Sequence, residues 1–337
     1  MKIYQHTSLL PYNTFGIDVT TDYFIEYESA SDLQEVLRSE TVKKNKTLHI
    51  GGGSNLLFLN DYKGVILHSA IQSITKVGED TESVILEVGS SVIWDDFVGY
   101  CVENNWGGVE NLSLIPGETG ASAVQNIGAY GVEVREVIVE IKAINVETTN
   151  FKTFTREECR YGYRDSIFKN ELKGKYIITS VVFKLEKKPF FRLNYQHLEE
   201  AVLKNGEINL QNIRKTIISV REDKLPDPKI LGNAGSFFMN PVVSKQFFND
   251  LIQQNPQMPH YYVSESEEKI PAGWLIDQCG WKGKSIGNAG VHVKQALVLV
   301  NKGGATGAEI VYLAEQIQDS VKQKFSIVLR PEVNYIK

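Results

Sequence analysis

The spacing of apolar and polar side chains predicts a chain in which strands and helices alternate. Residues 23–27 and 83–89 have the alternation of strands, and residues 30–38 have the period of a short helix. A second helix is expected after Ser90 or Ser91, either of which can cap it. Its apolar face consists of Trp94, Phe97, Val98, Cys101 and Val102.

Further strands are predicted in the central part of the chain. Residues 132–146 and 176–186 are rich in Val and Ile, and a capping box that begins at Thr155 predicts a short helix between them. A helix over 209–223 ends before the LPDP sequence at 225–228, whose prolines enforce extended backbone. We place a domain boundary there.

The C-terminal third has its own set of predicted elements. They are helices over 243–252 and 272–279 and strands over 295–301 and 326–336. Thr306 and Glu309 form a capping box for a long amphipathic helix. Its apolar stripe is expected to be core: Ile310, Leu313, Ala314, Ile317 and Val321.

Composition and charge narrow the class of protein. The 337 residues, 42% hydrophobic and 23% charged, are typical of a globular protein with two or three domains. A net charge of −5 argues against a nucleic-acid partner. The longest apolar run, residues 296–300, is too short to span a membrane, and the N-terminal residues lack a leader pattern, so we expect a soluble cytoplasmic protein.

Cysteine and histidine usage predicts neither disulfides nor a metal site. Cys101, Cys159 and Cys279 are an odd number at wide separations and are expected to be reduced packing residues. The six histidines form no pair at i, i+3 or i+4, so no metal is expected.

A glycine-rich turn is the first candidate for ligand binding. An apolar strand leads into Gly51, Gly52 and Gly53, which Ser54 and Asn55 follow before a second apolar strand. Consecutive glycines can form a nest of backbone N–H groups that suits a pyrophosphate. The turn lacks the lysine of a P-loop and the following helix of a Rossmann motif. A glycine-rich hairpin is the alternative.

Residues 115–131, IPGETGASAVQNIGAYG, are the second candidate. Four glycines and three alanines in seventeen positions argue against a helix or strand interior and favour backbone that lies against a ligand. The amides of Gln125 and Asn126 could contact the edge of a heterocycle. The alternative is an irregular loop buried under its own turns.

Several charged or hydroxyl side chains remain ambiguous when each is taken alone. Arg164 could hold a carboxylate or phosphate, or it could pair with Asp165. Ser236 lies on a glycine turn without the pattern of a hydrolase nucleophile. Glu332 is either an edge charge or a carboxylate placed in a cleft. The acidic pair at 95–96 suits a helix N-terminus and solvent.

Taken together, these segments resemble the UDP-N-acetylenolpyruvoylglucosamine reductase family, flavoenzymes that complete UDP-N-acetylmuramate in bacterial peptidoglycan synthesis. The resemblance covers nearly the whole chain and includes the branch with an extra substrate-covering loop. The motifs occur in the family order: NTFGID at 13–18, GGGSNLLF at 51–58, IPG and QNIGAYG within 115–131, YGYRDSIFK at 161–169, KLPDPK at 224–229, GNAGSFFMNP at 232–241, AGWLIDQCG at 272–280 and RPEV at 330–333.

The resemblance implies an α+β protein with a two-domain FAD-binding fold of the vanillyl-alcohol-oxidase type and a third α+β domain for substrate. The first FAD-binding part is expected over 1–70 and the second over 71–225, to which the C-terminal strand 326–337 returns. Residues 226–325 are expected to form the substrate-binding domain.

The resemblance also implies non-covalently bound FAD, with NADPH as co-substrate and a UDP-sugar enolpyruvyl ether as substrate. NADPH reduces FAD and leaves, and the flavin then gives hydride to the vinyl carbon of the substrate. At most weak self-association is expected. The implied FAD-binding residues are Gly51, Gly52, Gly53, Ser54, Asn55, Pro116, Gly117, Gly120, Ala121, Gln125, Asn126, Ile127, Gly128, Tyr130 and Gly131.

Three residues match the catalytic positions of the family. Arg164 matches the arginine that clamps the substrate carboxylate, Glu332 matches the protonated glutamate beside it, and Ser236 matches the proton donor. Met239 stands where some members carry a lysine. The substrate-binding matches are Tyr195, Lys224, Asn240 and Tyr261.

Two other functions would fit parts of this pattern. An FAD-dependent oxidase of the same fold would leave the Arg164, Ser236 and Glu332 set unexplained. A sugar-nucleotide-binding protein without catalysis would keep the fold but lose the flavin.

Overall fold

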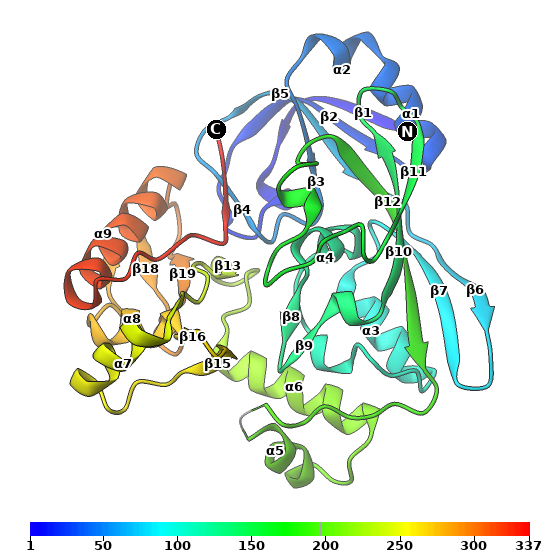
Figure 1. Ribbon diagram of the computed structural model, residues 1–337. Coiled ribbons are helices and arrows are strands. Elements are labelled where there is room, and N and C mark those ends of the chain that lie inside the picture. The colour runs from blue at the N-terminus through cyan, green and yellow to red at the C-terminus, as the bar shows by residue number, and fades with distance from the viewer. Residues whose placement is uncertain (196) are drawn as a thin grey trace. The chain divides into compact units, whose positions relative to one another are not determined.

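Two compact units make up the computed structural model, which describes residues 1–195 and 197–337. The first unit comprises residues 1–7, 21–52 and 63–221, and the second comprises residues 8–20, 53–62 and 222–337. Each unit is therefore assembled from three separate stretches of the chain. Helices and strands are mixed in both units (Figure 1), as the predicted α+β class requires.

A four-stranded sheet with the order β1-β2-β5-β3 is formed near the N-terminus. Its strands are β1 (Lys2–Ser8), β2 (Thr20–Tyr27), β5 (Tyr62–Ser69) and β3 (Thr47–Ile50), and the last two run parallel. Helices α1 (Ala30–Arg38) and α2 (Glu40–Lys44) follow β2. The Ser29 hydroxyl caps α1 by accepting a 3.0 Å hydrogen bond from the Asp32 N–H. The predicted helix over 30–38 is confirmed.

The second sheet of the first unit is antiparallel and has the order β11-β10-β12-β7-β6. Its strands are β11 (Phe151–Thr155), β10 (Ile138–Asn145), β12 (Tyr176–Glu186), β7 (Ser83–Gly89) and β6 (Ile74–Glu79). Helix α3 (Trp94–Glu103) buries the predicted apolar face. The ring of Phe97 lies 5.6 Å from that of Trp94 and 4.9 Å from that of Phe183 on β12, so α3 packs on this sheet.

Two local predictions in this unit are corrected. Helix α3 begins after Ile93, not after Ser90 or Ser91, because the Ser90 hydroxyl pairs with that of Ser69 at 2.7 Å. The Thr155 capping box does form, with Glu158 as its partner. The residues that follow make turns instead of a helix, and Arg160, at φ 45°, ends them in the left-handed region.

Shorter elements complete the first unit. They are α4 (Thr119–Gln125), β8 (Gly128–Ala129), β9 (Val132–Glu133), α5 (Leu198–Lys204), α6 (Leu210–Lys224) and the 3-10 turns η2 (Glu110–Leu112), η3 (Val134–Glu136) and η4 (Ile167–Lys169). Helix α6 begins and ends one residue later than the predicted range 209–223, and its last three residues belong to the second unit.

The second unit contains two small antiparallel sheets and three helices. One sheet has the order β13-β19-β18-β17 and the other β14-β16-β15. The strands are β13 (Gly232–Ser236), β19 (Val298–Asn301), β18 (Ala289–Val291), β17 (Ser285–Ile286), β14 (Val242–Ser244), β16 (Glu267–Lys269) and β15 (Tyr261–Ser264). The helices are α7 (Lys245–Gln254), α8 (Ala272–Gln278) and α9 (Gly307–Phe325), and a 3-10 turn, η1 (Leu10–Tyr12), precedes them in the chain.

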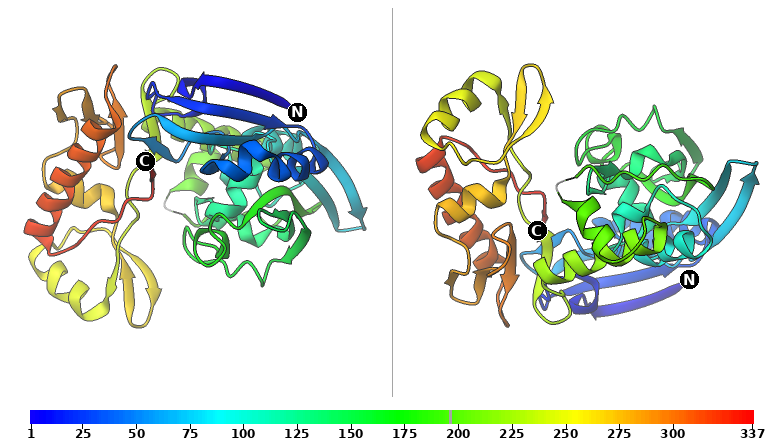
Figure 2. Two further views of the ribbon diagram at one scale, coloured as in Figure 1. Left: turned by 90° about the horizontal axis from the view of Figure 1, so that it is seen from above. Right: turned by 90° about the horizontal axis from the view of Figure 1, so that it is seen from below.

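Helix α9 lies along the sheet formed by β17, β18 and β19, as Figures 1 and 2 show. Thr306 and Glu309 make the predicted capping box, with reciprocal bonds of 3.2 and 2.8 Å. The predicted apolar stripe is buried along the whole helix. This helix is therefore specified by its own sequence from its cap to its core face.

The C-terminal strand pairs where we did not expect it. We predicted that residues 326–337 return to residues 71–225, but β20 (Asn334–Ile336) pairs in parallel with β4 (Leu56–Phe58) in the second unit. Main-chain bonds at both ends, between Asn334 and Asn55 and between Leu59 and Ile336, fix the register. The hairpin alternative for the glycine turn is wrong for the same reason, since β3 and β4 pair with different partners.

Candidate functional site

Residues 115–131 contain a short helix, which corrects the prediction that they avoid regular structure. Helix α4 forms because neighbouring backbone anchors it: the N–H groups of Thr119 and Gly120 each donate a 2.9 Å bond, to the carbonyls of Val92 and Ser90 respectively. A Cβ on Gly120 would lie 2.9 Å from the Ser90 Cβ, so the small residue permits this close approach. The composition signal was thus correct about close backbone packing and wrong about its form.

The two predicted cofactor-binding segments of the first unit lie against each other. A Cβ on Gly52 would stand 3.6 Å from the Gly117 Cα, and a Cβ on Gly51 would stand 3.0 Å from Glu118 Oε2 and 3.6 Å from the Ala121 Cβ. Gly52 thus faces the Gly117 backbone, and both glycines face the Glu118 side chain. This surface fits an extended ligand such as FAD, because a dinucleotide needs close access to main-chain N–H groups.

The Glu118 side chain continues into a row of titratable side chains. His68 Nε2 is 3.3 Å from Glu118 Oε1, and His68 Nδ1 is 3.6 Å from Glu26 Oε2. All three side chains are at most 20% exposed, so the Glu118 carboxylate is held away from solvent. Glu118 was not among the predicted site residues, although it stands between two of them.

The predicted amides Gln125 and Asn126 make protein contacts. Asn126, at φ 44°, ends α4 in the left-handed region, and its Nδ2 donates to the Gly162 carbonyl at 2.7 Å and to Glu133 Oε2 at 3.1 Å. Lys169 Nζ donates to Gln125 Oε1 at 3.0 Å. The Asn126 side chain therefore holds the stretch in shape, and any cofactor contact from this position must come from its backbone.

Arg164 is held directly against residues 126–128. Its guanidinium donates hydrogen bonds to the carbonyls of Gly128 and, at 3.4 Å, Asn126. A Cβ on Gly128 would stand 2.8 Å from Arg164 Nη1 and 2.9 Å from the Val132 carbonyl, and the second contact, with backbone, favours glycine there. Arg164 itself has φ 54°, a conformation that is uncommon for a non-glycine residue. The structure thus joins the predicted carboxylate clamp to the predicted flavin segment.

Tyr195 lies beside the same stretch. Its ring packs edge-on against Tyr130, with 5.8 Å between ring centroids, and a Cβ on Gly131 would stand 3.7 Å from the Tyr195 Cβ. Burial raises the pKa of the Tyr130 hydroxyl. One predicted substrate residue and two predicted cofactor residues are therefore neighbours within the first unit.

In the second unit, the structure brings the segments of Ser236 and Glu332 side by side. The Glu332 N–H donates to the Phe237 carbonyl at 2.8 Å, and Phe238 pairs with Pro331. Asn55 Nδ2 donates to the Glu332 carbonyl at 3.2 Å, so the glycine turn and the C-terminal segment meet here. Arg164 belongs to the first unit.

Ser236 is accessible on its turn, and the other predicted substrate residues of the second unit lie on separate elements. Gly235, at φ 66°, places Ser236 at the end of β13, where its side chain is exposed. Asn240 Oδ1 accepts from the Ala272 N–H at 2.9 Å and thereby caps α8. Lys269 lies over the Tyr261 ring at 5.8 Å, and Lys224 is exposed at the end of α6.

An arginine network in the first unit was missed by the sequence analysis. Asp95, expected to face solvent, binds Arg214 on α6 through two hydrogen bonds of 2.6 and 2.9 Å. Asp95 also accepts from the Leu114 N–H, and Arg221 Nε donates to the Leu114 carbonyl at 3.2 Å. Burial opposes ionisation, but these donors keep the pKa of Asp95 below its ordinary value. The seven-residue spacing of Arg214 and Arg221 was the available signal, since it puts both on one helix face.

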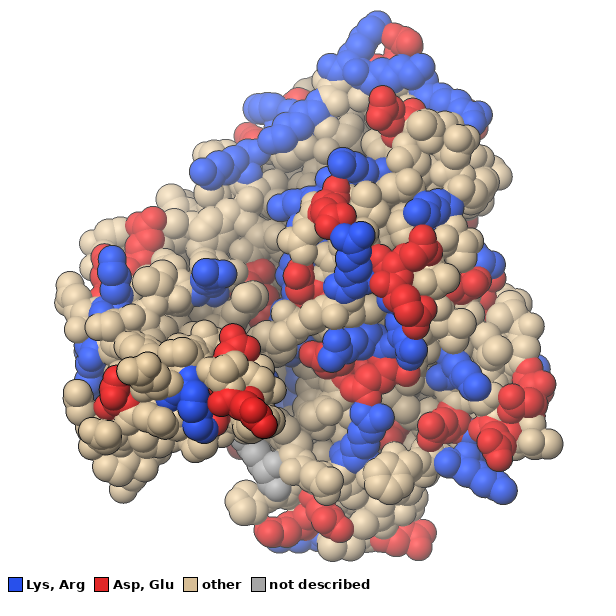
Figure 3. Space-filling model, viewed as in Figure 1, with Lys and Arg blue, Asp and Glu red and all other residues tan. Residues whose placement is uncertain are grey.

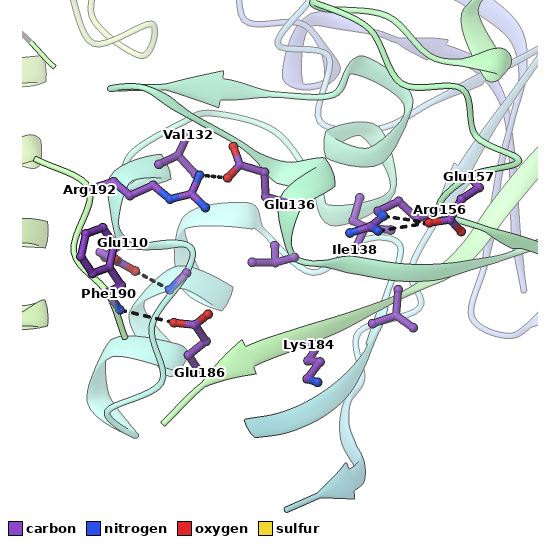
Figure 4. Close-up of a pocket in the computed structure, with 13 residues that line it drawn as sticks. Glu110, Val132, Glu136, Ile138, Arg156, Glu157, Lys184, Glu186, Phe190 and Arg192 are labelled. Atoms are coloured by element: carbon purple, nitrogen blue, oxygen red, sulfur yellow. Dashed lines mark hydrogen bonds and ion pairs between the residues drawn. The ribbon is translucent and has the colours of Figure 1, made fainter. Parts of the chain in front are cut away.

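The first unit also contains a cavity of about 550 Å³ that is distinct from the candidate site (Figure 4). None of its thirteen lining residues is a predicted site residue, and its charges are largely paired, Arg156 with Glu157 and Arg192 with Glu136. Glu110, buried at its base, accepts a 2.6 Å hydrogen bond from the Gly108 N–H. We therefore do not assign the candidate site to this cavity.

The described residues contain no metal-binding cluster, no disulfide and no membrane-spanning helix. Within residues 1–195 and 197–337, no group of three or more His, Cys, Asp or Glu side chains is arranged to hold a metal ion. The three cysteines are free thiols, and burial raises the pKa of Cys101 and, to about 11, that of Cys159. No helix in the described part of the chain has the length and apolarity needed to cross a bilayer. On the face shown in Figure 3, acidic and basic side chains are interspersed.

Two family models match this chain. One, described as an FAD binding domain, matches residues 21–151, and the other, described as the C-terminal domain of UDP-N-acetylenolpyruvoylglucosamine reductase, matches residues 227–336. The first match contains both glycine-rich segments, and the second contains Ser236 and Glu332.

Individual relatives are similar over the full length. The UDP-N-acetylenolpyruvoylglucosamine reductase of Bacteroides fragilis is 52% identical over 332 residues, which cover 98% of this chain and 99% of the relative. That of Porphyromonas gingivalis is 50% identical over 338 residues and covers 100% of both chains.

Solved structures share the fold. A UDP-N-acetylenolpyruvylglucosamine reductase from Thermus caldophilus has a TM-score of 0.70 at 20% identity and covers 100% of this chain and 98% of its own. A solvent-stable cholesterol oxidase has a TM-score of 0.51 at 11% identity, covering 98% and 86%. The predicted FAD-binding fold of the vanillyl-alcohol-oxidase type is confirmed.

Proposed function

This chain belongs to the UDP-N-acetylenolpyruvoylglucosamine reductase family, and we propose on that premise that Arg164, Ser236 and Glu332 carry its reaction. The activity is the FAD-dependent reduction of a UDP-sugar enolpyruvyl ether in peptidoglycan synthesis. When bound, FAD would accept a hydride from NADPH and deliver it to the substrate. The proposed FAD contacts are the two glycine-rich segments, and the close approach of Gly51 to Ala121 and of Gly52 to Gly117 supports this assignment.

Arg164 is proposed to bind the substrate carboxylate. Hydride addition to the vinyl carbon leaves negative charge on the neighbouring carbon, which is delocalised into that carboxylate. A guanidinium already fixed by the Gly128 carbonyl can stabilise this charge without reorganising. Preorganised donors of this kind are usually the largest contribution to catalysis.

Ser236 is proposed to give the proton to the carbanionic carbon, and Glu332 to donate a hydrogen bond to the substrate carboxylate. A serine hydroxyl is a weak acid, but a carbanion is a strong base, so position matters more than acidity. The bond between the Glu332 N–H and the Phe237 carbonyl supports a joint role, because it fixes the spacing of the two segments.

The other substrate-binding residues, the domain division, the location and the oligomeric state are also proposals. Tyr195 and Tyr261 are proposed to cover the substrate, as in the branch with the extra loop, while Lys224 and Asn240 are proposed to bind its diphosphate or sugar. The division into 1–70, 71–225 and 226–325 stays a prediction. We also propose a cytoplasmic protein that is a monomer or a weak oligomer.

The observation that carries this proposal is the 52% identity that extends over 98% of the chain. The test is the oxidation of NADPH by the FAD-loaded protein, followed by the absorbance of NADPH, with and without UDP-N-acetylenolpyruvoylglucosamine. We expect NADPH oxidation to depend on this substrate. We also expect Arg164→Met and Ser236→Ala to lower its rate strongly. Oxidation that instead tracks oxygen would identify an oxidase, and a colourless protein that binds the sugar nucleotide would identify a binding protein.

A further inference from the structure

Arg221 has a feature that the proposed reaction does not yet use. Its side chain is half-buried on α6, and among the described residues the Leu114 carbonyl is the one hydrogen-bond acceptor that it contacts, at 3.2 Å from Nε. A guanidinium carries five N–H donors, so most of the donors of Arg221 lack a protein acceptor at a site that is partly closed to water. Burial of such a cation is costly unless an anion compensates it.

The surroundings of Arg221 make the cost larger. Burial lowers the pKa of Arg221, Tyr130 and Asp95 oppose this lowering, and the charge of Arg164 adds to it. Tyr130 is a neutral hydroxyl near pH 7, because burial raises its pKa. The Asp95 carboxylate is engaged by Arg214 in a bidentate pair. The guanidinium groups of Arg164 and Arg221 therefore influence each other in a region that has little uncompensated negative charge.

Arg214 provides the contrast on the same helix face. It lies seven residues before Arg221, is about as buried as its partner Asp95, and places two terminal nitrogens on that carboxylate. Asp95 in turn accepts from the Leu114 N–H, while the Leu114 carbonyl accepts from Arg221. Arg214 and Asp95 thus fix the backbone at Leu114, a non-glycine residue with φ 58°. The Leu114 carbonyl in turn orients Arg221.

We propose that Arg221 is a second anion-binding arginine beside Arg164, oriented by Leu114 and used to bind anionic oxygen atoms of a ligand. This inference rests on the proposed function, which supplies two sources of such oxygens. One is the carboxylate of the enolpyruvyl substrate, which Arg164 is proposed to bind. The other is FAD, whose proposed segment begins directly after Leu114.

The test compares Arg221→Met with Arg214→Met as a matched loss of one arginine from the same face of α6. The first measurement is the melting temperature of the apoprotein. Removing Arg221 takes one donor from the Leu114 carbonyl but leaves no charged group unpaired and relieves repulsion, so we expect a melting temperature close to that of the parent protein. Removing Arg214 leaves the Asp95 carboxylate unpaired, so we expect a decrease of about 5 °C.

The second measurement is ligand affinity, which needs no turnover. FAD is titrated into apoprotein by quenching of flavin fluorescence, and UDP-N-acetylenolpyruvoylglucosamine is titrated into FAD-loaded protein, without NADPH, by the change in flavin absorbance. We expect Arg221→Met to weaken one of these affinities by about 10- to 100-fold, and the affected ligand identifies the source of the oxygens. Arg221→Lys, which keeps the charge without the fork, should recover part of the loss.

The inference is overturned if Arg221→Met binds both ligands as tightly as the parent protein does, or if it lowers the apoprotein melting temperature as Arg214→Met does without affecting either affinity. Failure of the proposed function is a separate result, because it would appear as absent NADPH oxidation in the parent protein itself.

Discussion

Asn126 and Gly128 show, at the scale of single residues, what sequence alone could and could not reveal about the site. Their motif predicted contact with a ligand, and the structure does place Arg164 on the carbonyls of both residues. The Asn126 side-chain amide, however, donates its hydrogen bonds to Gly162 and Glu133. Residue type specified the capacity for hydrogen bonds, but the partners come from segments distant in sequence, which no local pattern encodes.

Ser236 is the residue whose replacement most directly tests the proposed proton transfer. We expect Ser236→Ala to be reduced by NADPH at a normal rate and then to reoxidise with substrate about 10²- to 10⁴-fold more slowly, because the positioned proton donor is lost. Stopped-flow absorbance separates the two half-reactions. Ser244→Ala, at the N-cap of α7 in the same unit, is the control and should leave both rates unchanged. Normal reoxidation of Ser236→Ala would refute the assignment.

His49 gives a pH dependence of stability. Burial and the nearby charge of His68 lower the pKa of His49 to about 3 from 6.5, and Tyr27 Oη lies 2.8 Å from its Nε2. Between these values the unfolded state binds a proton that the folded state does not. The stabilisation is therefore fully present above pH 6.5 and is lost as pH falls toward 3, by at most about 1.4 kcal/mol per pH unit.

His49→Gln removes this titration while its amide can still bond to Tyr27. We expect the difference in the free energy of unfolding between the parent protein and His49→Gln to shrink as the pH is lowered from 7 to 4, measured by urea denaturation. Carboxylates titrate in both proteins and cancel in the difference. Two curves that stay parallel over this range would contradict the shifted pKa.

At the scale of elements, the sequence predicted helices that carry their own signals and missed those that depend on neighbours. The bounds of α1 match the prediction, and α9 follows its predicted cap, because cap and apolar stripe are adjacent in the chain. Helix α4 was missed because backbone at Val92 and Ser90 anchors it in spite of its glycines. The pairing of β20 with β4 was missed because it joins residues far apart in sequence.

The cap of α9 is a testable case of a local signal. Thr306→Ala removes the hydroxyl that accepts from the Glu309 N–H at 3.2 Å, so we expect the free energy of unfolding to fall by about 1 kcal/mol. Thr306→Ser keeps the acceptor and should cost only a few tenths of a kcal/mol. Hydrogen exchange of the first-turn amides of α9 provides the measurement. Equal protection in both variants would show that the capping box does not stabilise the helix.

At the scale of the whole molecule, the second unit depends on its last strand. Deleting residues 334–337 removes β20 and its hydrogen bonds to Asn55 and Leu59, at a cost of roughly 1 kcal/mol for each bond. We expect faster hydrogen exchange in α9 and unchanged exchange in β12, which belongs to the first unit. Deletion of Lys337 alone is the control. Equal slowing or acceleration in both units would argue that they do not unfold separately.

The pairing of β20 with β4 also sets an order of events during synthesis. Leu57 and Phe58 on β4 are fully buried once β20 and the rest of the second unit are in place. A ribosome adding about 5 to 20 residues per second needs roughly 15 to 55 seconds to travel from residue 62 to residue 334. For that interval the nascent chain carries an apolar strand whose partner has not yet been translated, which makes this segment a natural client for chaperones that bind at the exit tunnel.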